Sequence, residues 1–460
     1  MFKKFFAPTD MTQGSVWKSI VIFTLPMLIG NIAQQLYSTV DTIVVGNFAD
    51  NGDNAISAIG SALPIVNMFL VLFIGISAGA SVMVSQYFGA KNREALSYTV
   101  GNCITVTAIA CVALIAVLAP FVKPILILLN TPAETLQGCY DYLMISLIGV
   151  AGMAYYNILG GVIRGLGDSV TPLIFLLVAT GLNIGLDIWF VAGFGMDVAG
   201  VALATVISQV ISSLLCLIRL SMMHEHFDFG KKYMRPRAQY VKMIAKIGLP
   251  SGATQAIFSS AMIIVQSLTN SFGSQFIAAN VIIMRVDGFA MMPNFSFGTA
   301  MATFAGQNVG AGKYDRVMKG AKQGTLLAVG TSTAVTGLII LFGKHLMSLF
   351  TDTATLVNMS YRLMMILAVG YIAMAVTQSL SGVMRGAGDT LTPMWISLIT
   401  TVVVRVPVAY GIAYLTSPDG VPKHGWCESI QISLLCTWVL GAILTFIFYR
   451  IGRWKGKRLK

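Results

Sequence analysis

The chain has 460 residues, of which 56% are hydrophobic and only 10% are charged, and its formal net charge is +12. With a mean hydropathy of +0.78, it lacks the polar residues that would cover a soluble protein of this length, which excludes a soluble globular fold. The six cysteines occur singly, without a CxxC pair, which argues against a zinc site.

Apolar stretches long enough to cross about 30 Å of hydrocarbon as helices recur along the whole chain. The N-terminal segment MFKKFFAPTD is too short and too polar to be a cleavable signal, so we expect the first helix to be retained. We predict an all-α integral membrane protein with twelve transmembrane helices. In chain order, the spans are residues 17–46, 55–84, 96–119, 135–161, 170–193, 197–220, 241–270, 277–304, 319–343, 355–382, 391–415 and 427–450.

The positive charges indicate how these spans are oriented, because Lys and Arg accumulate in short cytoplasmic loops. If both termini are cytoplasmic, 24 of the 30 basic residues lie on that side. The loops opposite hold only Lys123, Lys344 and Lys423. The charge therefore predicts cytoplasmic termini and basic loops near anionic lipid headgroups, without a nucleic-acid partner.

An internal repeat divides the chain. The segment GVIRGLGDSVTP, residues 161–172, returns 221 residues later as GVMRGAGDTLTP, with eight of twelve positions identical. A polar stretch separates six predicted spans from six. We predict an N-terminal bundle at 1–220, a cytoplasmic linker at 221–240 and a C-terminal bundle at 241–460, related by a pseudo-twofold axis along the membrane normal.

The repeated RGxGD segment is expected to be a structural turn rather than a reactive site. Its glycines permit a tight turn. The arginine and aspartate of each copy, Arg164 with Asp168 and Arg385 with Asp389, can pair locally.

Ionisable residues at membrane depth are costly, and each is therefore a functional candidate. Asp187 follows Asn183 by one helical turn in the fifth span, and Thr205 in the sixth can add a hydroxyl. These three groups supply hard oxygen ligands that suit a small cation, whereas two nearby carboxylates would favour holding a proton. Asp41 of the first span is a further acid at membrane depth. Pro26 is expected to kink the first span and to act as a hinge.

The second half lacks this set. At an offset of 221, Asn183 and Asp187 correspond to Val404 and Val408. A pair required by the fold would be expected in both copies, so the asymmetry favours function over simple hydrogen bonding between helices. Arg405 stands beside the vacated position, where it can line a cavity or neutralise Asp287.

The eighth span carries a cluster of soft apolar side chains around a proline, which can repack around varied organic molecules. Ordinary helix packing is the alternative explanation of this cluster. We predict a substrate cavity that includes two residues of the first span and five of the second half: Gln34, Tyr37, Met284, Asp287, Met291, Met292 and Arg405, with Phe289 and Phe295 adjoining.

The chain resembles the multidrug and toxic compound extrusion (MATE) family over essentially its whole length. The resemblance rests on the opening segment GSVWKSIVIFTLPMLIGNIAQQLYSTVDTIVVG, on SQYFGA and GQNVGAGK, and on the duplicated GVxRGxGDxxTP. It implies a V-shaped pair of six-helix bundles in the plasma membrane. It also implies that the protein is no enzyme and exports organic, commonly cationic, compounds in exchange for H⁺ or Na⁺ by alternating access, as a monomer and without another cofactor.

The resemblance is closer to the archaeal and DinF-like branch than to the NorM-like branch. In the former branch a cation site occupies the first half, and its positions match Asp41, Asn183, Asp187 and Thr205, with Asn157 as a further polar member. The NorM-like branch uses acids in the seventh and tenth spans. This chain has none there, which argues against a site of that kind.

Two other classes of protein match parts of the sequence. A lipid-linked precursor flippase of the same superfamily shares the two-bundle plan, but usually has more helices and a more cationic cavity. An intramembrane aspartyl protease is suggested by YD at 140–141 and GLGD at 165–168, but the two aspartates lie on the order of 40 Å apart along nearly continuous helix. Drug export is therefore the favoured function.

Overall fold

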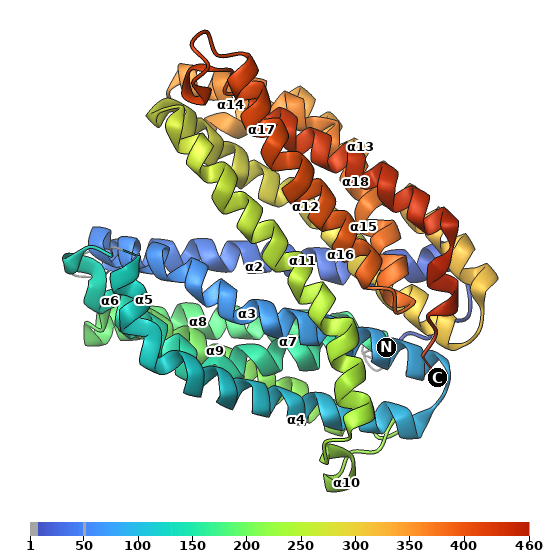
Figure 1. Cartoon of the computed structure of the whole chain (residues 1–460). Helices are drawn as coiled ribbons and strands as arrows, with labels where there is room; N and C mark the ends of the chain where they lie inside the picture. The colour runs from blue at the N-terminus through green and yellow to red at the C-terminus, as the bar shows by residue number, and fades with distance from the viewer. Residues whose placement is uncertain (1–7, 49–51, 130, 460) are drawn as a thin grey trace. The chain divides into compact units, whose positions relative to one another are not determined.

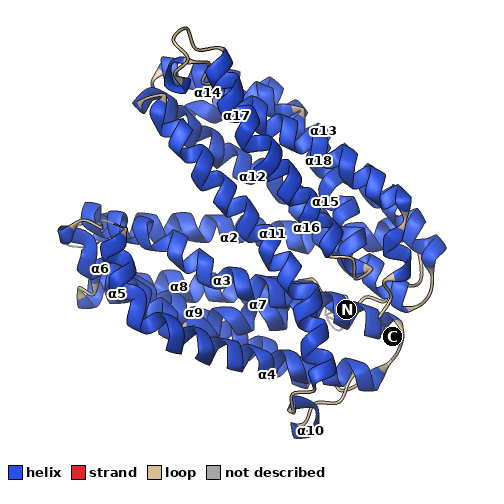
Figure 2. Ribbon diagram, in the orientation of Figure 1, coloured by secondary structure: helices blue, strands red, loops and turns tan. Residues whose placement is uncertain are grey.

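The computed structural model of the chain describes residues 8–48, 52–129 and 131–459, and within this part the side chains of 36–48 and 52–56 lie outside the description. Every regular element in the described part is a helix (Figures 1 and 2). The chain divides into two compact units. Unit 1 comprises residues 1–10 and 25–252, and unit 2 comprises residues 11–24 and 253–460. Each unit is described by itself.

Unit 1 contains the helices from the first to the sixth predicted span. In chain order these are α2 (Val16–Phe48), which begins in unit 2, α3 (Gly52–Gly89), α4 (Arg93–Leu118), η1 (Ala119–Phe121), α5 (Val122–Leu128), α6 (Ala133–Ile148), α7 (Val150–Gly165), α8 (Val170–Asp187), the π-helical segment η2 (Ile188–Gly193), α9 (Asp197–Ser221) and the short α10 (Lys231–Met234).

Unit 2 repeats the order of long helices. They are α11 (Ala238–Ser271), whose first part lies in unit 1, α12 (Ser274–Gly310), α13 (Tyr314–Ser348), α14 (Ala354–Ala368), α15 (Gly370–Gly386), α16 (Leu391–Leu398), the π-helical segment η3 (Ile399–Val404), α17 (Arg405–Leu415), η4 (Pro422–His424), α18 (Ser429–Ile451) and η5 (Arg453–Gly456).

The observed helices confirm the prediction of a multi-pass membrane protein. Ten helices of the described part are long and apolar enough to cross a membrane, and two bent pairs raise the number to as many as 12. The bent pairs are α6 with α7, at 48°, and α14 with α15, at 44°. The six-and-six division of the sequence remains a prediction, because the compact units are defined by contacts and assign the ends of α2 and α11 differently.

The internal repeat is also a repeat of packing. In unit 1, a Cβ atom on Gly165 of α7 would lie 2.8 Å from the carbonyl oxygen of Ser81 on α3. In unit 2, a Cβ atom on Gly386 of α15 would lie 2.2 Å from the carbonyl oxygen of Ala302 on α12. The two contacts are related by the same offset of 221. The repeated glycines are therefore required by the close approach of two helix backbones in each unit.

A second pair of contacts follows the same offset near the other ends of α3 and α12, where the partner helices are α6 and α14. The Cys139 thiol donates to the carbonyl oxygen of Ala58 at 3.3 Å, and the Ser360 hydroxyl donates to that of Ala279 at 3.3 Å. Cysteine and serine thus take the same structural role. Cys139 is free and buried, as free cysteines in proteins commonly are.

The RGxGD segments are structural turns, as expected, but the predicted arginine partners are wrong. The Asp168 carboxylate accepts hydrogen bonds from the backbone N–H groups of Val170 and Thr171, and it pairs with Arg219 at 3.4 Å. Asp389 likewise accepts hydrogen bonds from the Thr392 backbone N–H at 3.4 Å and from the Thr392 hydroxyl at 2.8 Å. The aspartates therefore cap the helices that follow them, because the first N–H groups of a helix lack partners within the helix.

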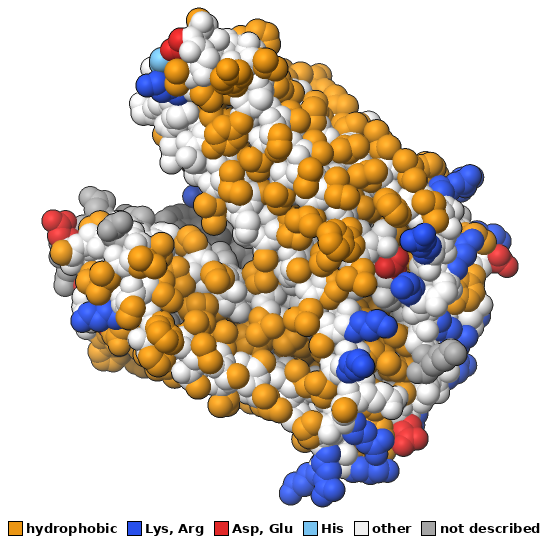
Figure 3. Space-filling view, viewed as in Figure 1, with side chains coloured by type: hydrophobic (Ala, Val, Ile, Leu, Met, Phe, Trp, Pro, Cys, Tyr) orange, Lys and Arg blue, Asp and Glu red, His pale blue; other side chains and the backbone are white. Residues whose placement is uncertain are grey.

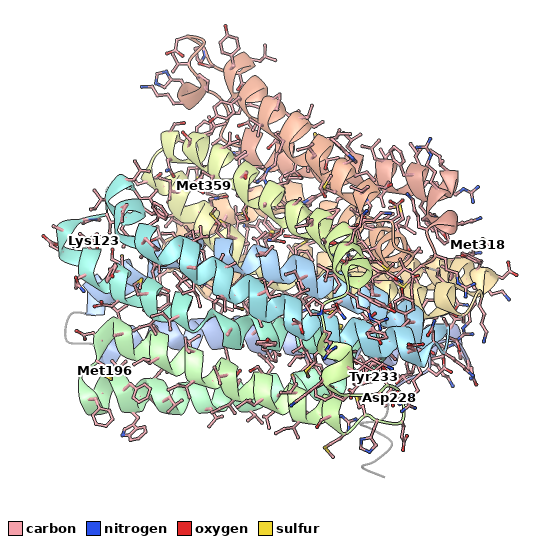
Figure 4. All side chains as sticks on the ribbon, turned by 60° about the horizontal axis from the view of Figure 1, so that its bottom comes forward. Lys123, Met196, Asp228, Tyr233, Met318 and Met359 are labelled. Carbon is pink, nitrogen blue, oxygen red and sulfur yellow. The ribbon has the colours of Figure 1, made fainter. Side chains whose placement is uncertain are left out.

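The segment between α9 and α11 is bound to unit 1 by polar contacts. The Arg93 guanidinium donates to the Asp228 carboxylate at 2.7 Å, and Asn102 accepts a hydrogen bond from the backbone of Arg237 at 2.8 Å. Figure 4 shows Asp228 and Tyr233 near each other at this end of the unit. On the face shown in Figure 3, Lys and Arg side chains gather around α10, whereas apolar side chains cover the flanks of the long helices.

The segment that precedes α2 is bound to unit 2 in a similar way. The Arg316 guanidinium donates to the carbonyl oxygens of Met11, Gln13 and Gly14, and Gln307 accepts the backbone N–H of Met11 at 2.9 Å. The GQNVGAGK motif, which contains Gln307, therefore helps to fix the segment that precedes the first membrane helix.

Candidate functional site

A buried polar set lies at the end of α8 in unit 1. Asn183 and Asp187 have no exposed surface, although both lie within a candidate membrane span. The Asn183 side-chain amide donates to the Thr205 hydroxyl of α9 at 3.4 Å. Because Asp187 lies one helical turn beyond Asn183, the two side chains share one stripe of α8. The structure thus brings together Asn183 and Thr205 as predicted, with Asp187 beside them along the helix.

The helix changes from α-helical to π-helical geometry directly after Asp187. Asp187 is the last residue of α8, and the π-helical segment η2 begins at Ile188. A π-bulge inserts an extra residue into the hydrogen-bonding ladder, and such bulges are frequent at functional sites. The local irregularity therefore coincides with the acid that the sequence singled out. Periodicity alone did not reveal it, because π-helical and α-helical segments have similar composition.

Other predicted members of the cation site are not joined to this set by a described contact. The Asn157 amide donates to the carbonyl oxygen of Met153 in its own helix, at 2.8 Å. Asp41 and Tyr37 lie in helix α2, but their side chains are outside the described residues. Gln34, which was predicted to line the substrate cavity together with Tyr37, is exposed. The predicted hinge Pro26 lies within continuous helix, just after the point where α2 passes from unit 2 to unit 1.

The donor chemistry of the set fits a small cation. A carboxylate, an amide and a hydroxyl supply oxygen atoms of the kind that hard cations prefer. Among the described residues, no group of three or more His, Cys, Asp or Glu side chains could hold a metal ion. A transition-metal centre is thus not indicated there, whereas a site for H⁺ or Na⁺ requires only one or two acids with neutral oxygen donors.

Unit 2 carries a second polar set at different positions. The Tyr371 hydroxyl of α15 donates to the Asp287 carboxylate of α12 at 2.9 Å. Arg405, the first residue of α17, is only 8% exposed and interacts electrostatically with Asp287 without forming an ion pair in the described structure. Tyr371 was missed by the sequence analysis, because a tyrosine within an apolar helix does not stand out from packing residues.

The predicted apolar wall of α12 is divided between two environments. Met284, Phe289 and Phe295 are exposed in unit 2. Met291 and Met292 are buried, and Met291 belongs to the core cluster of the unit. This placement favours helix packing for the two buried methionines, and it leaves Met284 as the methionine available to a ligand.

Two helical units with a repeated packing pattern, apolar membrane spans and isolated buried polar sets define a multi-pass membrane transporter. The comparisons with known proteins agree. The chain is 29% identical to the probable multidrug resistance protein YoeA of Bacillus subtilis, covering 97% of this chain and 96% of that protein. It is 26% identical to the probable multidrug resistance protein NorM of Thermotoga maritima, covering 99% and 96%.

The fold also matches solved structures. A MATE protein in a straight conformation aligns with a TM-score of 0.88 at 23% identity, over 96% of this chain and 97% of that chain. A bent conformation aligns with a TM-score of 0.88 at 22% identity, over 97% and 98%. The MatE family profile matches residues 26–189 and 250–411, one segment in each half. The chain therefore belongs to the MatE family, and it is a transporter of small molecules, not an enzyme.

Proposed function

We propose that this transporter exports organic, mainly cationic, compounds across the plasma membrane in exchange for H⁺ or Na⁺, without any other cofactor. The observation that carries the proposal is the fully buried pair Asn183 and Asp187 in a membrane span of unit 1, at positions where unit 2 has Val404 and Val408. A buried acid that the repeated fold does not need is expected to bind a ligand. The multidrug resistance names of the relatives support the substrate class.

In this proposal, the coupling ion is bound by Asp41, Asp187, Asn183 and Thr205, with Asn157 in support. Ion and substrate must prefer different conformations, because a ligand with equal affinity for both cannot shift the balance between them. Pro26 removes one backbone hydrogen bond from α2, so the helix can bend there at low cost. The straight and bent conformations of a similar MATE structure support a change of this kind.

Transport into inside-out membrane vesicles tests the proposal. Proton and sodium gradients are imposed separately, and the accumulation of a fluorescent organic cation is followed. We expect one gradient to drive accumulation, and we expect Asp187→Asn to abolish it while the protein remains in the membrane. Asp141→Asn is the matched control, because Asp141 is a partly buried acid that accepts a hydrogen bond from exposed Gln137. Accumulation by Asp187→Asn equal to that of the wild type would exclude the coupling role.

We further propose that both termini are cytoplasmic and that the protein acts as a monomer. The exposed Lys231, Lys232 and Arg235 then lie near anionic lipid headgroups. A variant without native cysteines, carrying one new cysteine at Lys457 or at Lys423, tests the orientation. Impermeant thiol reagents should label the two positions from opposite sides of the membrane. A two-copy mass of the extracted protein in native mass spectrometry would contradict the monomer.

A further inference from the structure

Arg405 of unit 2 is a buried charge that forms no salt bridge among the described residues. Its side chain is 8% exposed, and its Nε atom is buried without a hydrogen-bond partner. A guanidinium stays protonated at any physiological pH, so it cannot relieve this situation by losing its charge. Because burying an unpaired charge is costly, the position is expected to receive an anionic group in some functional state.

The acidic group that interacts electrostatically with Arg405 is hydrogen-bonded to another residue. Asp287 accepts its hydrogen bond from the Tyr371 hydroxyl at 2.9 Å, and Arg405 acts on it only through electrostatic attraction. Two opposite charges therefore lie within interaction range without being joined. A ligand with one positive and one negative group could interact favourably with both side chains at once. A ligand with a single charge would be attracted by one side chain and repelled by the other.

The backbone around this pair is irregular. Arg405 follows the π-helical segment η3 directly, and Tyr371 lies two residues after the 44° bend that separates α14 from α15 at Val369. The bend has a counterpart of 48° between α6 and α7 of unit 1, so it belongs to the repeated fold. The π-helical segment beside Arg405 is the local irregularity, and such segments often mark functional positions.

The carboxylate side of the set is open. Asp287 is only partly buried, and a Cβ atom added to the adjacent Gly288 would meet no atom within 4 Å. Met284, one turn away on α12, is exposed. A ligand can therefore approach Asp287 along this part of α12 without displacing packed side chains.

The repeat shows that the fold does not require the set. At the offset of 221, Asp287, Tyr371 and Arg405 correspond to Val66, Val150 and Ile184 in unit 1. Val66 and Val150 are buried there. Aliphatic side chains thus serve the same packing positions, and the polar residues of unit 2 need another reason.

We infer that Asp287 and Arg405 form a binding site for a zwitterionic organic compound, with its cationic group at Asp287 and its carboxylate at the planar guanidinium of Arg405. The inference rests on the proposed export function and deepens it, because it names a substrate class. An arginine fork matches a carboxylate with two parallel hydrogen bonds, which gives the pair its selectivity. Tyr371 positions the Asp287 carboxylate and does not itself select between ligands.

A pair of dyes that differ in one group tests the inference. A rhodamine with a free benzoate is a zwitterion, and the methyl ester of the same dye is a cation. Binding of each to the purified full-length protein is measured by fluorescence anisotropy. We expect Arg405→Gln to weaken binding of the free acid by roughly 10- to 100-fold, the range for a lost hydrogen bond to a charged group, and not to weaken binding of the ester, whose cationic group Arg405 repels.

Three variants complete the test. Arg285→Gln is the matched control, because Arg285 is exposed two residues from Asp287, and it should alter neither affinity. Asp287→Asn should weaken the binding of both dyes, since both carry the cationic group. Gly288→Leu should hinder both by filling the open space, whereas Gly288→Ala should not.

The outcomes separate this inference from the proposed function. The zwitterion site would be overturned if Arg405→Gln weakened the binding of both dyes equally, or weakened the binding of neither. The same conclusion would follow if the wild-type protein bound the ester and not the free acid. In each case, gradient-driven accumulation of an organic cation in vesicles would still support export.

Discussion

The side-chain amide of Asn183 lies 3.4 Å from the hydroxyl of Thr205, and this contact joins α8 to α9 inside unit 1. Unit 2 places Val404 at the position that corresponds to Asn183 and still forms its own bundle. Helix packing in the repeated fold therefore does not depend on this contact, which the proposed function assigns to the ion site.

Removal of the Thr205 hydroxyl should weaken the coupling site. Thr205→Val keeps the shape of the side chain and deletes one oxygen donor. We expect the concentration of driving ion that half-saturates export to rise about 10-fold, as for other groups that support a cation site. Ion titrations of dye accumulation in vesicles measure this. Thr205→Ser keeps the hydroxyl and should behave as the wild type, and an unchanged ion dependence in Thr205→Val would exclude a role for this residue.

The close helix contact in unit 2 predicts a strong dependence on glycine. Gly386→Ala would place a Cβ atom 2.2 Å from the carbonyl oxygen of Ala302, so the helices must separate. We expect the free energy of unfolding to fall by about 1–3 kcal/mol, the usual cost of overpacking. Gly337→Ala in α13 is the control, because its Cβ atom would meet nothing within 4 Å. The melting temperatures of the two variants in detergent are compared by thermal unfolding. Equal melting temperatures would contradict the packing argument.

The two helix caps should differ in strength. Asp168 accepts hydrogen bonds from two backbone N–H groups and pairs with Arg219. Among the described residues, Asp389 accepts hydrogen bonds from Thr392 alone, from its hydroxyl at 2.8 Å and its backbone N–H at 3.4 Å. Asp168→Ala should destabilise the first turn of α8 by about 1–2 kcal/mol, and Asp389→Ala should affect α16 less. Hydrogen exchange of the first-turn amides measures each effect locally. A larger effect at Asp389 would show that the cap geometry does not set the local stability.

The contact between Arg93 and Asp228 should make the linker sensitive to acid. The hydrogen bond from Arg93 lowers the pKa of Asp228 below its ordinary value. Because the folded-state pKa is lower than the unfolded one, the contact stabilises the linker at pH values above about 4 and is lost as the pH falls through the lowered value.

Asp228→Asn should mimic that loss at neutral pH. We expect faster tryptic cleavage after the exposed Lys231 and Lys232 in this variant than in the wild type. Glu225→Gln is the control, because the Glu225 contact with Arg93 uses its backbone carbonyl oxygen, which the substitution keeps. Identical cleavage rates in Asp228→Asn and the wild type would show that the ion pair does not hold the linker.

Much of the architecture could be predicted because the bilayer imposes length and hydropathy on each helix. All twelve predicted spans correspond to observed helices or bent helix pairs. The predicted pairing of Arg164 with Asp168 failed for a different reason. Neighbours in sequence compete with partners from other helices, and Arg219 approaches Asp168 from α9.

The sequence by itself determined the membrane class, the spans, the internal repeat and the one-sided placement of Asn183 and Asp187, because these depend on composition and on comparison of the two halves. Only the tertiary structure decided which side chains meet. It brought Tyr371 to Asp287, left Arg405 buried beside them and placed Met291 in the core. Such contacts arise from the rotation and bending of helices far apart in sequence, which hydropathy and spacing do not encode.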